Sequence, residues 1–220
     1  MIRFSILTLF PEAIRPYLDS SMLWKAQKDK KIKVNLVNPR DFTSDKHHRA
    51  DDRPYGGGPG MVMKAEPILG AISKLKVRNS KQKGFEIRNS KFVLTSPRGK
   101  EFTNKLAAQW AKKYQNIVLI AGHYEGIDAR VKKILQAEEI SVGPYTLTGG
   151  ELPALVIVDA VTRRLPGVLG KSESLEELRV ASGEVYTRPE TLKFKGRSYR
   201  VPKILLSGHH KNIETWRARR

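Results

Sequence analysis

The residues best suited to do chemistry in this sequence lie in three glycine-bearing segments, each beside a short apolar run. They are residues 94–99 (LTSPRG), 121–128 (AGHYEGID) and 142–151 (VGPYTLTGGE). Glycine lets backbone N–H and C=O groups come close to a flat ligand. The last two segments carry few phosphate-binding side chains, so the three together favour an adenine-bearing, phosphate-poor ligand. S-adenosylmethionine fits that description better than ATP. Tight turns that hold no ligand are the alternative interpretation.

A fourth segment, residues 51–61 (DDRPYGGGPGM), sets two acids and an arginine beside a run of glycines. Charged side chains on a glycine-rich loop are typical of a lid or of a loop that contacts RNA. A compact surface loop with solvated charges is the alternative.

Several other chemistries are excluded. The sequence has no Walker phosphate loop, no dinucleotide-binding G-x-G-x-x-G after its first strand and no G-x-S-x-G elbow. It has no cysteine, which rules out disulfides and cysteine zinc sites. The pairs His47–His48 and His209–His210 lack the i, i+4 spacing of a helical metal site. We therefore interpret them as solvated or RNA-facing and predict no metal-ligating residues.

The charge of the chain indicates a polyanionic partner. Its 220 residues include 41 Lys and Arg against 22 Asp and Glu, a formal net charge of +19. Residues 187–220 carry ten basic and two acidic residues, whereas residues 170–186 carry two basic and four acidic ones. Such a balance suits nucleic acid; a merely lysine-rich, soluble surface is the alternative. No apolar run approaches the roughly 20 residues of a membrane span, and Pro11 ends the first apolar stretch early. We expect a cytoplasmic globular protein that does not bind membranes.

Strands that alternate with helices predict an α/β fold with a mainly parallel sheet and helices on both faces. The expected strands are 2–9, 32–37, 92–95, 116–121 and 139–142, and the expected helices are 11–19, 20–30, 65–76, 100–113, 127–135 and 151–164. Residues 41–63 are expected to form a loop, and residues 77–91 a surface insertion or hairpin. In such a fold, ligands bind outside the carboxyl ends of the strands, where the three glycine segments lie.

The chain is expected to divide into three parts. Residues 1–169 form the main, basic domain, residues 170–186 an acidic, poorly periodic linker, and residues 187–220 a short, very basic domain.

The order of the motifs resembles one enzyme family. Seven motifs follow one another along almost the whole chain: Thr8-Leu9-Phe10-Pro11-Glu12, the 51–61 segment, GHYEGID at 122–128, GGELPAL at 149–155, PGVLG at 166–170, YTRP at 186–189 and LLSGHH at 205–210. This set resembles the bacterial tRNA (guanine-N1)-methyltransferases of the SPOUT superfamily, which methylate guanosine 37 beside the anticodon. The resemblance implies a deep trefoil knot, S-adenosylmethionine as methyl donor and Mg2+ as an aid to methyl transfer. It also implies a homodimer with its active site between subunits, and a small, mostly helical C-terminal domain that binds tRNA.

The resemblance also carries site residues over to this chain. The positions implied for methyl-donor binding are Pro97, Gly122, Tyr124, Gly126, Val142, Gly143, Pro144, Tyr145, Thr146, Leu147, Gly149 and Gly150. The positions implied for tRNA are Asp52, Arg53, Tyr55, Gly58, Pro59, Glu125, Arg188 and His209. Pro144 departs from the family, which usually has an aspartate there, so one polar contact is in doubt.

Two catalytic roles follow from the reaction. Removal of the guanine N1 proton builds negative charge on O6, and the resemblance assigns Arg163 to face it; a helix C-cap is the alternative for this arginine. The general base of the family is a linker aspartate, but the ungapped position here holds Leu178. A shift of one residue makes Glu177 the base, with Glu176 as the second choice. A solvated linker without a catalytic part is the alternative.

The leading hypothesis is therefore a tRNA (guanine(37)-N1)-methyltransferase that transfers the methyl group of S-adenosylmethionine. A SPOUT methyltransferase with another RNA target is the second hypothesis. A non-catalytic RNA-binding relative is the third, because of Leu178.

Overall fold

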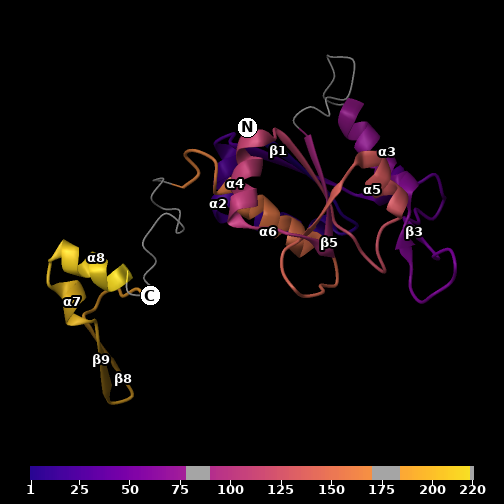
Figure 1. The fold of residues 1–220 in the computed structure, drawn as a ribbon. Helices are drawn as coiled ribbons and strands as arrows, with labels where there is room; N and C mark the ends of the chain where they lie inside the picture. Colours follow the sequence, from indigo (N-terminus) through magenta and orange to yellow (C-terminus); the bar gives the residue numbers. More distant parts are fainter. Residues whose placement is uncertain (78–89, 170–183, 219–220) are drawn as a thin grey trace. The chain divides into compact units, whose positions relative to one another are not determined.

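The computed structural model describes residues 1–77, 90–169 and 184–218. The chain divides into two compact units, Met1–Val168 and Leu169–Arg220, each described by itself below (Figure 1). Residues 78–89 of the predicted insertion at 77–91 lie outside the described residues, as does most of the predicted linker, with Glu176, Glu177 and Leu178.

The first unit is built on a five-stranded sheet in which every neighbouring pair is parallel. Its strands are β1 (Ile2–Leu7), β2 (Ile32–Val37), β5 (Ser90–Glu101), β6 (Asn116–Ile120) and β7 (Glu138–Ser141). They lie in the order β2-β1-β6-β5-β7, so β5 contacts both β6 and β7. The α/β fold with a mainly parallel sheet is thus confirmed.

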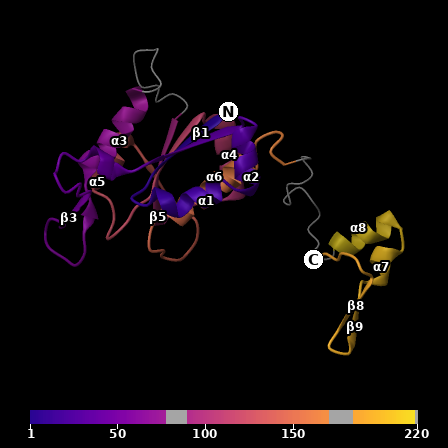
Figure 2. The ribbon, with the colours of Figure 1, turned by 180° about the vertical axis from the view of Figure 1, so that it is seen from behind.

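Helices cover both faces of this sheet (Figures 1 and 2). One face carries α1 (Pro11–Leu18), α2 (Ser21–Lys28), α4 (Asn104–Lys113) and α6 (Glu151–Thr162), and the other carries α3 (Ala65–Val77) and α5 (Ala129–Leu135). Successive residues of a strand face opposite sides. In β6, Ile117 and Leu119 therefore pack into the first core, whereas Val118 and Ile120 pack into the second.

The longest strand, β5, differs most from the expectation. Sequence analysis ended the strand at residue 95 and began a helix at 100, but β5 runs to Glu101. The pairing of β5 with β7 shifts between Thr95 and Lys100, which both lie opposite Ile140. The helix starts later because the Thr103 hydroxyl caps it by accepting from the Leu106 N–H at 3.3 Å.

The predicted loop at 41–63 contains short regular pieces. The 3-10 helix η1 (Pro39–Phe42) precedes it, and the two-residue strands β3 (Asp51–Asp52) and β4 (Val62–Met63) pair antiparallel at its base. Met63 forms a parallel bridge with Ile127, which ties this base to the segment after β6.

The second unit is small and has little core. It contains the antiparallel hairpin of β8 (Thr191–Phe194) and β9 (Arg197–Arg200), followed by α7 (Lys203–Leu206) and α8 (His210–Ala218). Helices were expected here, but the hairpin was not. Within residues 184–217, no side chain is fully buried. Across the described residues of both units, no helix has the length and apolar character to cross a bilayer.

Candidate functional site

A cavity of about 660 Å³ opens beyond the carboxyl ends of β6 and β7, next to residues 94–98 within β5. Its walls are the three glycine-bearing segments, as a parallel sheet predicts for its carboxyl edge. Eleven of the twelve residues expected for donor binding line it: Pro97, Gly122, Tyr124, Gly126, Val142, Gly143, Tyr145, Thr146, Leu147, Gly149 and Gly150. Pro144 does not line it, and Glu125, expected on the tRNA side, does.

Glycines allow the walls of this cavity to pack against each other. A Cβ on Gly150 would overlap the Thr95 hydroxyl and would lie 2.6 Å from Ala121 Cα. A Cβ on Gly149 would overlap the His123 ring. The Gly150 N–H donates to the Gly122 carbonyl at 2.8 Å, which joins the second and third segments. At Gly149 and Gly150 the segments of the cavity wall therefore lie closer together than any side chain at these positions would allow.

A buried polar network supports this junction. Glu151, the first residue of α6, accepts a hydrogen bond from the Thr8 hydroxyl at 2.5 Å and pairs with His123 Nε2 at 2.7 Å. Because a carboxylate only accepts, Nε2 carries the proton of the second bond. The Thr8 hydroxyl also accepts from the Phe10 N–H at 2.9 Å. The end of β1, the second glycine segment and the start of α6 are thereby held together.

Five of the expected tRNA residues lie on β3 or in the loop between β3 and β4. Asp52 lies on β3, and Arg53, Tyr55, Gly58 and Pro59 follow it in the loop, where Tyr55 is fully exposed. The Asp52 carboxylate accepts from the Arg53 N–H at 2.8 Å and lies 3.6 Å from Lys64 Nζ. These contacts, the backbone N–H first, lower the pKa of Asp52 below its usual value. Asp52 thus stays anionic at neutral pH.

This loop is joined by main chain to the donor-side cavity. The Glu125 N–H donates to the Met61 carbonyl at 3.0 Å, and the Met63 N–H donates to the Gly126 carbonyl at 2.9 Å. A Cβ on Gly60, where φ is +77°, would lie 2.7 Å from Glu125 Cγ. The expected tRNA-side loop and the expected donor-side loop therefore form one continuous surface.

Arg163 lies away from the cavity within this chain. It is the C-cap of α6, and its N–H donates to the Asp159 carbonyl at 3.0 Å. The N-terminal end of α6 lines the cavity, and twelve residues at 1.5 Å each put Arg163 about 18 Å further along the helix axis. The helix thus separates the expected catalytic arginine from the donor pocket of its own chain.

Two expected tRNA residues belong to the second unit. Arg188 lines a second cavity there, with Tyr186, Leu205 and Trp216 among its neighbours. The His209 carbonyl accepts from Asn212 and Ile213 N–H at the start of α8. Within the ranges described, no three His, Cys, Asp or Glu side chains gather as a metal site.

Sequence analysis missed Thr8, His123 and Glu151 as site residues. All three stand inside the motifs that carried the family resemblance, and this membership was the available signal. Their partnership spans 143 and 28 residues of sequence, so no local pattern displays it.

Comparison with known proteins agrees with these features. The family model described as tRNA (Guanine-1)-methyltransferase TrmD matches residues 2–220. A tRNA (guanine-N(1)-)-methyltransferase of Desulforamulus reducens is 46% identical over 218 residues, which cover 99% of this chain and 83% of that protein. Its counterpart from Carboxydothermus hydrogenoformans is 47% identical over 220 residues, with 98% and 81% covered.

A solved structure is similar as well. The crystal structure of tRNA (m1G37) methyltransferase from Aquifex aeolicus matches with a TM-score of 0.78 and 40% identity, over 99% of this chain and 88% of that one. The similarity thus includes both the sequence and the arrangement of the elements. By its sequence over residues 2–220 and by its fold, the chain belongs to the tRNA (guanine-N1)-methyltransferase family.

Proposed function

We propose that this chain transfers a methyl group from S-adenosylmethionine to N1 of the guanosine that follows the anticodon of tRNA. One observation carries the proposal: the three glycine segments of the motif set line a single cavity, in a chain that matches the family over residues 2–220. We place the reaction in the cytoplasm, by the similarity to tRNA methyltransferases.

The cavity suits the donor in size and lining. Its volume of about 660 Å³ lies in the range of small-molecule sites. Five glycines are among its lining residues, and Tyr124, Tyr145 and Leu147 keep between 39% and 54% of their surface exposed at its wall. Bound there, S-adenosylmethionine would supply a methyl group already activated by its sulfonium. The residues of the cavity would bind and orient the donor.

The protein must then handle one proton and one charge. Guanine N1 carries a proton at neutral pH, and a base has to take it as the new N1–methyl bond forms. Glu177, or Glu176 in second place, is our proposed base. The charge that develops on O6 requires a cation, and we assign Arg163 to it, because guanidinium is always charged and donates in a fixed plane. The 53–59 loop and Glu125 would hold the guanine.

We further propose that two copies of the chain form the active site. The supporting observation is that Arg163 and the cavity lie at opposite ends of α6, so a second copy is needed to bring an arginine to the donor. Leu152 and Val156, one turn apart on α6, are 60% and 48% exposed. An apolar pair of this kind suits burial against a second copy. The trefoil knot stays a prediction from the family.

The test of the activity uses two tRNA transcripts that differ only in guanosine or adenosine at position 37. Purified protein is incubated with each transcript and labelled S-adenosylmethionine, and the modified nucleoside is identified. We expect 1-methylguanosine in the first transcript and no product in the second. Product in both would point to another RNA target, and tRNA binding without product would indicate a non-catalytic relative. An EDTA arm tests the predicted Mg2+ requirement.

The test of the base is separate. The double variant Glu176→Ala/Glu177→Ala should lose most of its turnover and keep its affinity for donor and tRNA. Single variants identify which glutamate acts. Unchanged turnover in the double variant would exclude both glutamates and leave the methyltransferase assignment standing.

A further inference from the structure

The hairpin of β8 and β9 presents an exposed aromatic face that nothing in the described part of the second unit covers. Residues directly opposite each other in the hairpin share a face, and the register pairs Leu192 with Tyr199 and Phe194 with Arg197. The three large side chains among these are 57%, 53% and 59% exposed, in the order Leu192, Tyr199 and Phe194. An isolated two-stranded hairpin is only marginally stable in water, so an apolar face of this kind is normally packed against other elements.

The opposite face and the turn are basic. Lys193 and Arg200 lie on the other face with Thr191 and Ser198. The strands are joined by Lys195 and Gly196, whose φ angles are +47° and +74°, the two left-handed positions of a tight hairpin turn. Lys195 Nζ lies 5.5 Å from the Phe194 ring centroid. Residues 191–200 thus carry four basic side chains and no acidic one.

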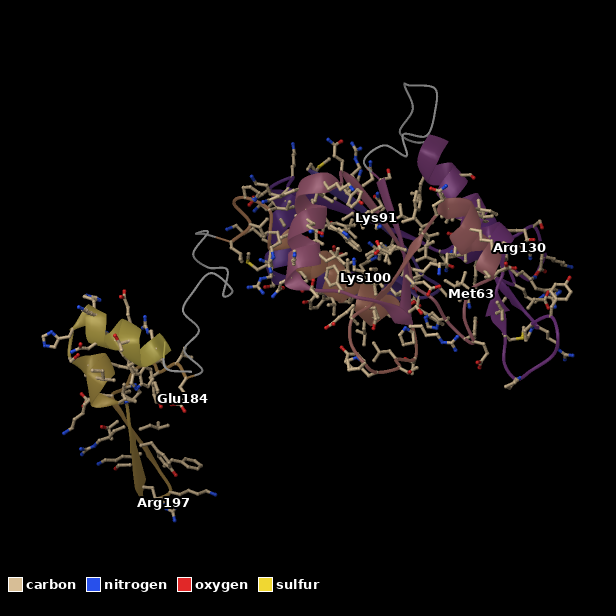
Figure 3. All side chains as sticks on the ribbon, in the orientation of Figure 1. Met63, Lys91, Lys100, Arg130, Glu184 and Arg197 are labelled. Carbon is tan, nitrogen blue, oxygen red and sulfur yellow. The ribbon has the colours of Figure 1, made fainter. Side chains whose placement is uncertain are left out.

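Charge decides which partner this surface fits. A protein surface that buried these aromatic rings would have to neutralise the surrounding cations. Residues 1–169 of this chain are themselves basic overall, with 29 Lys and Arg against 16 Asp and Glu, and the whole chain carries +19, so another copy of the chain repels this surface on balance. A polyanion offers the opposite charge, and a nucleic acid also has bases that stack on exposed rings. Figure 3 shows Arg197 at the turn end of the hairpin, far from α7 and α8.

We propose that this hairpin binds unpaired nucleotides of RNA, with bases stacked on Phe194 and Tyr199 and phosphates held by Lys193, Lys195, Arg197 and Arg200. The proposal rests on the proposed function for the identity of the RNA as tRNA. Base pairs inside a helix do not offer their flat faces, so the hairpin distinguishes single-stranded from duplex RNA.

The decisive variant is Phe194→Ala/Tyr199→Ala. Loss of two stacking rings should raise the Kd for a tRNA transcript, and for a short single-stranded RNA, by about 10- to 100-fold. Binding to a duplex of the same sequence should change little. The matched control is Trp24→Ala in the first unit, which removes a ring that is 49% exposed and has Lys28 Nζ 4.9 Å from its centroid. This control should bind RNA like the parent.

Two further variants separate stacking from folding and from charge. Phe194→Trp/Tyr199→Trp keeps aromatic planes in place and should restore the affinity, with quenching of the added tryptophan fluorescence by single-stranded RNA. Lys193→Ser should lower the slope of log K against log salt by about 0.7 to 0.9 and leave the preference for single strands intact.

Each result bears on the proposal. If the double alanine variant binds tRNA and single-stranded RNA as tightly as the parent, the hairpin does not contact RNA. If that variant instead changes the molecular mass in solution, the rings face a protein surface and the proposal is wrong. If the parent methylates tRNA and the double alanine variant binds RNA as tightly as the parent, only this inference is wrong. If the parent does not methylate tRNA but the double alanine variant loses RNA affinity, only the proposed methyl transfer is wrong.

Discussion

The two units of this chain differ in how much of their side-chain surface they bury. The first unit buries two hydrophobic cores on either side of a parallel sheet and has five glycines among the residues that line its cavity. The second buries no side chain fully in its described part and displays basic and aromatic groups. Donor binding needs a fixed shape, which a dense core supplies. Binding a long polyanion needs exposed charge, which such a core would exclude. The contrast shows how one short chain accommodates both demands.

Salt should separate the two units most strongly. Six or more phosphate contacts would weaken tRNA binding by about 10³-fold between roughly 50 and 200 mM salt. Donor binding depends on a cavity with few cations and should change by much less. Parallel titrations of tRNA and S-adenosylmethionine at several salt concentrations measure this. A tRNA affinity that stays flat with salt would contradict the role assigned to the basic second unit.

A single methyl group should damage the first unit next. Gly150→Ala places a Cβ against the Thr95 hydroxyl and the Ala121 backbone, at a cost of about 3 kcal/mol. Donor affinity by calorimetry should fall about 100-fold, and tRNA affinity should persist. Gly122→Ala is the matched comparison, because its Cβ would meet Ile127 Cδ1 at an ordinary 3.5 Å. Equal losses in the two variants would argue against a cavity shaped by backbone packing at Gly150.

The buried polar network ranks third. Glu151→Ala leaves Thr8 and His123 without their shared acceptor and should lower the free energy of unfolding by about 2 kcal/mol. Glu151→Gln keeps an acceptor and should lose less. Urea unfolding followed by circular dichroism gives both values. Donor affinity should follow the same order as stability, because the network holds the cavity wall in place. If neither change altered donor affinity, the network would not contribute to the donor site.

The smallest effect concerns Asp128 at the start of α5. Its carboxylate caps the helix by accepting from the Arg130 N–H at 2.9 Å, and Asp128→Ala should cost about 1 kcal/mol at pH 7. The Arg130 side chain, and then its backbone N–H, lower the pKa of Asp128. A lowered pKa means that ionisation favours the folded state above the usual Asp value, and that this stabilisation is lost as pH falls through the folded-state pKa. The difference in unfolding free energy between parent and variant should shrink as pH falls below the ordinary Asp pKa of 3.8. A difference that stays constant at low pH would mean that the charge of Asp128 does not contribute to the cap.

The sequence predicted those elements and site positions that depend on residues close together in the chain or on the geometry of a parallel sheet. The strand at 32–37 was predicted to the residue, because its alternation is complete within six positions. The expected donor positions gathered in one cavity because the ends of parallel strands meet at one edge. The continuation of β5 to Glu101 was missed because polar residues 96–101 reveal neither burial nor their partner β7. The β8–β9 hairpin was missed because its apolar residues are not buried, and strand prediction depends on burial.

The close packing at the glycines of the cavity wall has a consequence for how such a protein changes over generations. A substitution at a half-exposed side chain of the wall, such as Tyr124 or Tyr145, leaves the path of the backbone and hence the shape of the cavity unchanged. The glycines are different, because at Gly149 and Gly150 any replacement adds atoms where neighbours already stand. Mutational tolerance should therefore vary sharply from one position to the next, with intolerant positions set by the path of the backbone more than by the chemistry of methyl transfer.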